Sequence, residues 1–278
     1  MKKINRRSFL AAAGLTAAAL ALTACGGSAS STASSTASSA ASSEAASTSA
    51  AAELTTVEAG KLTMATNAAF PPYEMTTDAG EGEGIDIDTA KAIAEKLGLE
   101  LQIDDLDFDA ALLSVQQGKA DIVMAGVTVT DERKAVMDFS DSYATGIQSI
   151  IVPEGSDITS PDDLAGKKIG TQRGTTGYIY CSDDFGDDAV VAYDDGLTAV
   201  QALNNGQVDA VVIDNAPAKE FVAANPGLVI LDTSYAEEDY AIGLAKGSAL
   251  EDAVNAALEE LKADGTLQSI VDKYINAE

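Results

Sequence analysis

The chain has no histidine and only two cysteines, Cys25 and Cys181. Without histidine, Ser-His-Asp and Cys-His catalytic arrangements are excluded, and so is a metal site built from cysteine and histidine ligands. Positive charge is also scarce, because 17 Lys and Arg residues stand against 44 Asp and Glu residues. Such an acidic surface repels nucleic acid and anionic lipid. We therefore expect no nucleic-acid partner, no metal and no cofactor.

The N-terminal segment has the layout of a bacterial export signal. An apolar run from Phe9 to Leu22 follows a positive n-region, and it is too short for a comfortable transmembrane span. Leu22-Thr23-Ala24-Cys25 resembles the lipobox of bacterial lipoproteins, in which the cysteine is lipidated and becomes the first mature residue. We expect a lipoprotein signal peptide at 1–24 and an extracytoplasmic protein anchored to the cell membrane through lipid on Cys25. A soluble secreted protein cut nearby is the alternative. Arg6-Arg7 also resembles a twin-arginine signal, which leaves the export route open.

A tether follows the signal. Residues 26–53 are almost entirely Ser, Ala and Thr, with no hydrophobic periodicity, so they cannot bury a core. We assign 25–58 to the lipidated cysteine and a flexible tether. Removal of the signal takes the formal net charge from −27 to −31. With Cys25 lipidated, Cys181 has no partner, and no disulfide forms within the chain.

The rest of the chain alternates between short β runs and amphipathic helices. Strands are predicted at 61–66, 99–103, 121–124, 168–171, 190–193, 208–213 and 240–245. Helices are predicted at 108–117, 197–205, 216–224, 249–264 and 267–275. Two more are predicted to end at Leu97 and at Tyr180. Residues 67–74 are predicted to be a loop, because two prolines exclude regular structure. This alternation is typical of an α/β fold in which helices cover a parallel sheet.

Met124 to Arg133 is the stretch with the clearest binding chemistry. It follows a buried strand, opens into small residues at Ala125 and Gly126, and leads into a helix whose expected N-cap is Thr130. Exposed backbone N–H groups and a helix start favour an anion. The guanidinium of Arg133 matches a carboxylate with two parallel hydrogen bonds. The alternative is an ordinary capped helix with a solvated arginine.

A short internal sequence similarity, which we call the echo, suggests a second group of ligand-binding residues opposite Met124 to Arg133. Residues 115–123 match residues 203–211, each with a helix end, a glycine cap and a buried strand that begins with aspartate. If two similar lobes are built this way, Gly126 and Asp214 both follow the carboxyl end of a parallel strand, where open α/β sheets bind ligands. Arg133 and Asp214 would then complement the two charges of an α-amino acid. The echo can also be no more than a common αβ joint.

Several blocks together resemble the extracellular solute-binding proteins of family 3, which deliver polar amino acids to ABC transporters. They are Gly84-Ile85-Asp86-Ile87-Asp88, the segment Asn67 to Glu74, the segment Gly126 to Arg133, and Asp138-Phe139-Ser140. The resemblance covers roughly Leu62 to Tyr274. It implies a periplasmic-binding-protein-like fold, with two α/β lobes joined by two hinge strands and a cleft between them. It places lobe 1 at 59–144 plus 241–278 and lobe 2 at 145–240, with the strands crossing near 143–147 and 236–240. A monomer that delivers its ligand to an ABC transporter permease is expected.

The same resemblance implies roles for individual residues. Arg133 would bind the ligand α-carboxylate, helped by Thr128 and by N–H groups at Thr175 and Thr176. Asp214 would bind the α-amino group, with the Gly126 carbonyl as a second acceptor and Ala125 beside them. Phe70 and Phe108 would sandwich the ligand side chain, although core packing is their alternative. The positions that touch the side-chain tip are Asn67 and Gln172.

The ligand class is less sharply predicted. Relatives that bind lysine, arginine or glutamine often carry aspartate at the position of Asn67, and a buried cation without a partner is costly. A polar, uncharged amino acid is therefore the first choice. Arg173 can either favour an acidic ligand or point into solvent.

Two other functions compete. A periplasmic-type dehydratase of aromatic amino-acid precursors would need a poised acid or base, for which Glu74 and Asp109 are the spare carboxylates; solvated loop positions are the simpler interpretation of both. A ligand-sensing receptor domain would usually need a membrane segment and an output domain. We expect a binding protein, not an enzyme.

Overall fold

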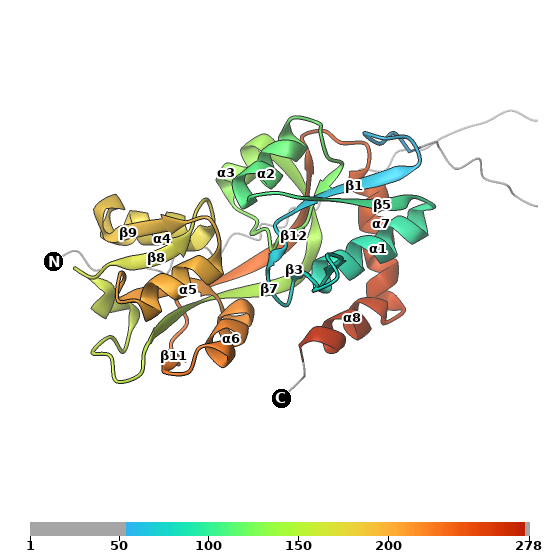
Figure 1. Cartoon of the computed structure of the whole chain (residues 1–278). Helices are drawn as coiled ribbons and strands as arrows, with labels where there is room; N and C mark the ends of the chain where they lie inside the picture. The colour runs from blue at the N-terminus through green and yellow to red at the C-terminus, as the bar shows by residue number, and fades with distance from the viewer. Residues whose placement is uncertain (1–53, 276–278) are drawn as a thin grey trace, which may run out of the picture. The chain divides into compact units, whose positions relative to one another are not determined.

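The computed structural model describes residues 54–275. The predicted signal peptide, Cys25 and most of the tether lie outside the described residues. No helix within the described range is long and apolar enough to cross a membrane. The described residues form the globular part of the chain (Figure 1).

One long mixed sheet runs through the globular part. Its hydrogen-bonded order is β5-β1-β6-β12-β7-β10-β8-β9, with β11 also paired to β7. The strands are β1 (Lys61–Thr66), β5 (Glu100–Asp105), β6 (Ile122–Val123), β7 (Met137–Pro153), β8 (Ile169–Gln172), β9 (Val190–Tyr193), β10 (Ala210–Asp214), β11 (Leu228–Ile230) and β12 (Ala236–Ala245). A small antiparallel sheet is formed by β2 (Ala69–Phe70), β3 (Glu74–Thr76) and β4 (Gly82–Glu83).

The helices pack on both sides of this sheet. They are α1 (Ile85–Leu97), α2 (Phe108–Gln116), α3 (Asp131–Val136), α4 (Thr176–Phe185), α5 (Gly196–Asn204), α6 (Asn215–Ala224), α7 (Glu251–Ala263) and α8 (Thr266–Tyr274), with short 3-10 turns η1 (Pro161–Leu164) and η2 (Asp187–Ala189). Helix ends follow local signals. Gly98 closes α1 in the left-handed region at φ 70°, where glycine has no Cβ to clash. Thr130 caps α3 as predicted, because its side chain accepts from the N–H of Arg133.

The fold has two lobes. We call lobe 1 the part built on β5, β1 and β6, and lobe 2 the part built on β10, β8 and β9. Strands β1, β5 and β6 are parallel to one another, and so are β8, β9 and β10. Two long strands connect the lobes: β7 and β12 pair antiparallel from Gln148 with Ala236 to Met137 with Ala245. Figure 1 shows both strands passing between the lobes.

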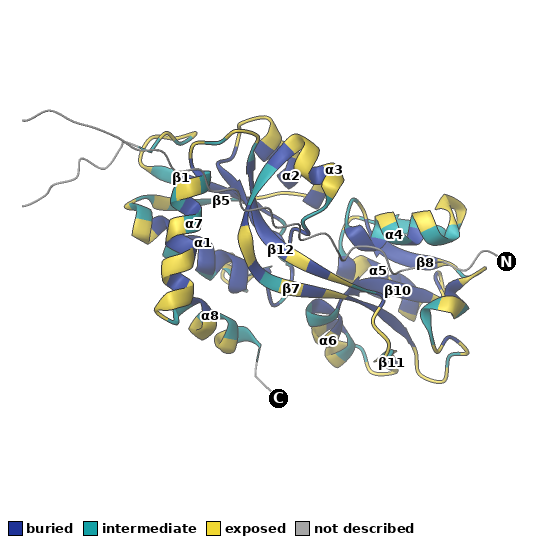
Figure 2. Cartoon of the chain, turned by 180° about the vertical axis from the view of Figure 1, so that it is seen from behind, coloured by how far each residue is buried: buried dark blue, intermediate teal, exposed yellow. Residues whose placement is uncertain are grey.

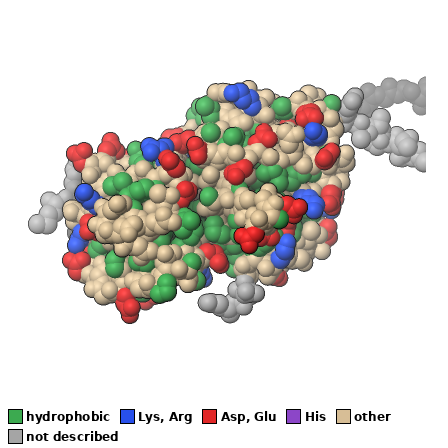
Figure 3. Space-filling view, viewed as in Figure 1, with side chains coloured by type: hydrophobic (Ala, Val, Ile, Leu, Met, Phe, Trp, Pro, Cys, Tyr) green, Lys and Arg blue, Asp and Glu red, His purple; other side chains and the backbone are tan. Residues whose placement is uncertain are grey.

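The core follows the strands. Apolar side chains of β1, β6, β10 and β12 are buried, while the outer faces of the helices are exposed (Figure 2). Acidic side chains are spread over both lobes with few basic ones among them (Figure 3). The predicted alternation of strands and helices is confirmed.

One local prediction was wrong, and one expected strand is longer than predicted. The segment after β1, predicted to be a loop, contains the short strands β2 and β3 around a cis bond between Pro71 and Pro72. The resemblance implied a crossing strand only near 143–147, whereas β7 is continuous over 17 residues. Its pairing with β12 stabilises it, and that pairing lies outside the reach of local patterns.

Candidate ligand-binding site

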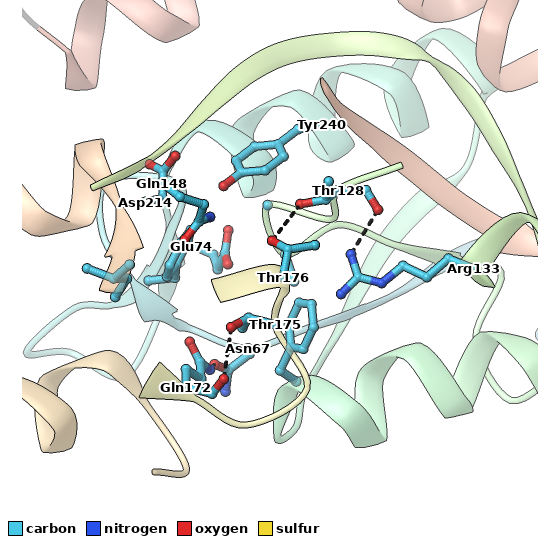
Figure 4. A pocket seen from close by; sticks show the side chains of 15 residues that line it. Asn67, Glu74, Thr128, Arg133, Gln148, Gln172, Thr175, Thr176, Asp214 and Tyr240 are labelled. Atoms are coloured by element: carbon cyan, nitrogen blue, oxygen red, sulfur yellow. Dashed lines mark hydrogen bonds between the residues drawn. The ribbon is translucent and has the colours of Figure 1, made fainter. Parts of the chain in front are cut away.

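A pocket lies between the lobes, at the carboxyl ends of the parallel strands (Figure 4). Its empty volume is about 400 Å³, counting the part open to solvent. Every residue predicted to bind ligand lines it: Asn67, Phe70, Phe108, Ala125, Gly126, Thr128, Arg133, Gln172, Thr175, Thr176 and Asp214. The structure therefore brings together residues that are up to 147 positions apart in the chain.

Arg133 is held as a buried cation on one side of the pocket. Its Nη1 donates to the carbonyl of Thr128 at 2.8 Å, and its Nη2 donates to the carbonyl of Gly174, in lobe 2, at 3.1 Å. The guanidinium lies 5.3 Å from the ring centre of Phe108, which is a cation–π distance. Burial lowers the pKa of Arg133, an effect that the carboxylate of Glu238 opposes. A buried, oriented guanidinium is suited to pair with a carboxylate.

Phe108 was predicted to contact the ligand side chain, and in the structure it also contacts the guanidinium of Arg133. Its ring is 6 % exposed and lines the pocket, so it can contact a ligand and support the guanidinium at once. Phe70 lines the pocket as well and stacks on Tyr73, with 5.9 Å between ring centres. Phe70 also lies against Gly126, where a Cβ would come within 2.9 Å of the ring and where φ is +53°. A side chain at position 126 would displace the ring.

Asp214 faces the pocket from the end of β10. One carboxylate oxygen accepts from the N–H of Ala216 at 2.9 Å and caps α6; the other accepts from the N–H of Ile147, on the hinge strand β7, at 2.8 Å. Burial raises the pKa of Asp214 to about 6, against these hydrogen bonds, which lower it. The carboxylate is therefore preorganised, and it gains from a cation placed beside it.

A pair of buried acids lies next to Asp214. Asp86 accepts from the N–H of Gly126 at 3.0 Å and from the hydroxyl of Tyr143 at 2.8 Å. Burial raises the pKa of Asp86 to about 6 and raises that of Glu74 well above its ordinary range. The negative charge of Asp86 adds to this upward shift of the Glu74 pKa. Through its bond to the N–H of Gly126, Asp86 sets the orientation of the peptide that faces the pocket.

The expectation that Glu74 is a solvated loop residue was wrong. Its side chain is 0 % exposed and lines the pocket, because β3 folds it back over the start of α1. Asp109, by contrast, is exposed on α2.

The far end of the pocket carries amides. Gln172 Nε2 donates to Asn67 Oδ1 at 2.9 Å across the cleft, and Asn67 Nδ2 donates to the carbonyl of Leu106 at 2.8 Å. Arg173 does not line this pocket; it is exposed and lies 3.7 Å from Asp194. Its contribution to ligand choice is therefore not supported.

A third group of polar side chains joins the lobes. Thr128 and Thr176 approach within 3.3 Å through their hydroxyl oxygens, and Thr175 caps α4 by accepting from the N–H of Tyr178. First-turn N–H groups have no partner inside their helix, so the start of α4 offers donors to an anion. No cluster of metal-ligating side chains is present in residues 54–275.

Sequence reasoning missed part of the site. The pocket is also lined by Gln148, Ile213, Tyr240 and Glu74. Three of these belong to strands β7, β10 and β12, where nothing in the local pattern separates a pocket residue from a core residue. Their positions follow from the pairing of the two hinge strands.

Comparison with known proteins is consistent with this geometry. Residues 62–277 match the family model of bacterial extracellular solute-binding proteins, family 3, and the chain belongs to this family. It is 32% identical to the probable histidine-binding protein of Neisseria gonorrhoeae, over 99% of this chain and 98% of that one. Its fold is similar to that of an ancestral arginine-binding protein bound to glutamine (42% identity, TM-score 0.75, 78% of this chain and 99% of that chain). The same holds for an ancestral arginine-binding protein bound to arginine (43% identity, TM-score 0.74, with the same coverage).

Proposed function

We propose that this protein binds one polar α-amino acid in the cleft and delivers it to the permease of an ABC transporter. The observation that carries the proposal is the pairing of two buried, opposite charges in one pocket between two lobes. Arg133 is 8 % exposed and Asp214 is 2 % exposed. Each is held by hydrogen bonds to backbone groups, and together they match the carboxylate and ammonium of a zwitterion.

The proposed contacts are those implied by the family. Arg133, Thr128 and the start of α4 receive the α-carboxylate. Asp214 and the carbonyl of Gly126 receive the α-ammonium. The ligand side chain then extends between Phe70 and Phe108 toward Asn67, Gln172 and the amide-lined end. Ala125 is in van der Waals contact.

A neutral polar side chain is our first choice of ligand. The tip of the pocket presents two amides rather than a carboxylate, which favours a group that both donates and accepts. The similar proteins named above are described as binding histidine, arginine or glutamine. L-Glutamine and L-arginine are therefore the first two ligands to compare.

We propose the remaining organisation from the sequence. Residues 1–24 are a lipoprotein signal peptide, Cys25 carries the lipid anchor, and 25–58 is the tether. Lobe 1 spans 59–144 plus 241–278 and lobe 2 spans 145–240. The protein acts as a monomer at the outer side of the cell membrane, and it is not an enzyme.

Thermal-shift screening of the purified protein against the twenty amino acids and cystine tests the function. A ligand at about 100 times its dissociation constant stabilises by about 2.7 kcal/mol, which raises the melting temperature by about 5–10 °C. We expect at least one polar L-amino acid to produce this shift and Arg133→Ala to abolish it. Absence of a shift with every ligand would overturn the proposal, and turnover of arogenate or prephenate would favour the dehydratase.

A further inference from the structure

Glu238 lies on the hinge strand β12, behind the wall of the pocket, and its carboxylate is the meeting point of three segments. Its Oε2 accepts from the hydroxyl of Thr128 at 3.1 Å, from the hydroxyl of Thr176 at 3.0 Å, and from Nε2 of Gln148 at 3.0 Å. Glu238 itself is 6 % exposed. The three donors are 110, 62 and 90 positions away in the chain.

One of these donors comes from the opposite lobe. Thr176 begins α4 in lobe 2, and Gln148 lies on β7 where it pairs with Asp214 of lobe 2, whereas Thr128 precedes α3 in lobe 1. The carboxylate, which two lobe 2 donors orient, can accept from Thr128 only when the lobes are close together. Hydrogen bonds to a charged acceptor are about twice as strong as neutral ones, so this contact favours the closed arrangement.

Glu238 also lies close to the buried cation of the pocket. The guanidinium of Arg133 is near enough to its carboxylate for a favourable charge interaction. Both Thr hydroxyls donate their single proton to Glu238. Neither hydroxyl can then donate to a ligand, and the carboxylate of a ligand is left to Arg133 and to backbone N–H groups.

We propose that Glu238 is a positioning residue that latches the two lobes together and thereby populates the closed cleft before ligand arrives. Only the ligand-binding consequence of this proposal rests on the proposed function. When only a fraction of the protein is in the binding-competent state, the apparent dissociation constant equals the intrinsic one divided by that fraction. Loss of the latch therefore raises the dissociation constant by the factor by which the closed fraction falls.

The test measures closure without ligand. Spin labels on Gln117→Cys, at the C-cap of α2, and Asp183→Cys, on α4, both exposed positions, report the distance between the lobes by electron–electron dipolar spectroscopy. The full chain carries Cys25→Ser so that only these sites are labelled, since Cys181 is buried. Glu238→Gln removes the charge and keeps the shape. Glu237→Gln, one position earlier and exposed, is the matched control, and circular dichroism checks that each variant folds.

We expect a closed population in the ligand-free protein and in Glu237→Gln, and about a tenfold smaller one in Glu238→Gln. Thr128→Val removes the one donor that comes from lobe 1, should also decrease the closed population, and keeps the test available if Glu238→Gln does not fold. Equal distance distributions in Glu238→Gln and the parent protein, or no closed population in the parent, would overturn the latch.

Titration with L-glutamine and L-arginine follows. The dissociation constant of Glu238→Gln should rise by the factor seen in the distances. If neither amino acid binds the parent while the distances change as expected, the latch stands and the choice of ligand, not the latch, has failed.

Discussion

Two joints, one in each lobe, have the same construction up to the last residue of a strand. At the end of α2 and at the end of α5, a glycine adopts φ 67°, and an aspartate three positions later immediately precedes a strand. Gly118 and Gly206 donate to matching carbonyls of the preceding helix turn at 3.0 Å. The N–H groups of Asp121 and Asp209 both donate to the neighbouring strand at 2.8 Å. The predicted echo between the lobes is present in the structure.

The joints differ where the strands end. In lobe 1 the chain passes through Gly126 and Thr128 to Arg133, whose guanidinium donates hydrogen bonds. We call this side of the pocket the donor wall, and the side formed by Asp214 the acceptor wall. In lobe 2 the strand ends at Asp214, a buried acceptor that caps α6. The repeated part builds the lobe, and the divergent part supplies the charge that recognises a ligand.

Arg133→Ala removes the cation of the donor wall. A ligand carboxylate then stays buried without a partner, which costs about 2–5 kcal/mol, or roughly a 30- to 5,000-fold loss of affinity. Calorimetric titration with the amino acid found in the thermal screen measures it. The control is Arg173→Ala, outside the pocket, which should leave affinity within about twofold. Comparable losses in the two variants would contradict the assignment.

Asp214→Asn tests the acceptor wall. The amide keeps the size of the side chain but loses the charge that pairs with an ammonium, and we expect affinity to fall by about 2–3 kcal/mol. Asp209→Asn changes the first residue of the same joint, away from the pocket, and should bind normally. Equal affinities for Asp214→Asn and the parent protein would show that the ammonium is bound elsewhere.

The stability of the protein and its affinity for ligand should depend on pH with opposite slopes. Burial raises the pKa of Asp86 and Asp214 to about 6, against about 3.9 in an unfolded chain. The folded state therefore holds more protons between these values. This contribution to stability is fully present below about pH 4 and is lost as the pH rises through about 6.

Ligand binding has the opposite slope, because a protonated Asp214 does not attract an ammonium. Affinity should fall about tenfold per pH unit below about pH 6. Melting temperatures and titrations across this range, for the parent and for Asp214→Asn, separate this group from the acidic surface common to both. Parallel pH profiles in the two proteins would contradict the predicted role.

The smallest difference lies in the joints themselves. Asp121 is 6 % exposed and accepts from the N–H groups of Val57 and Thr63, both at 2.8 Å. Asp209 is exposed and accepts from the N–H of Lys168 at 2.7 Å. Asp121→Asn leaves a buried donor unpaired and should lower the free energy of unfolding by about 2 kcal/mol; Asp209→Asn should lower it by about 0.5–1 kcal/mol. Urea denaturation of both variants measures the difference.

The sequence predicted what depends on local signals. Signals within a few residues determine the end of α1 at Gly98 and the N-cap of α3 at Thr130. They also determine the aspartate that precedes a strand in each half of the echo. Asn67, Phe70, Gly126, Thr128 and Arg133 were predicted because they lie in the blocks that carry the family resemblance. The other predicted lining residues were assigned from the roles that the resemblance implies. Glu74 was misjudged and Glu238 was missed, because their burial depends on contacts between distant segments. For Glu238, all three hydrogen-bonding partners are 62 or more positions away.

In the proposed function, the cleft recognises both charges of a zwitterion. One calorimetric series should compare the preferred L-amino acid with its α-amide and its N-acetyl derivative. Each derivative lacks one charge and keeps the side chain. We predict that both bind at least about 100-fold more weakly than the parent amino acid, since each leaves Arg133 or Asp214 unpaired. If either derivative binds as tightly as the parent, the two-charge account is wrong.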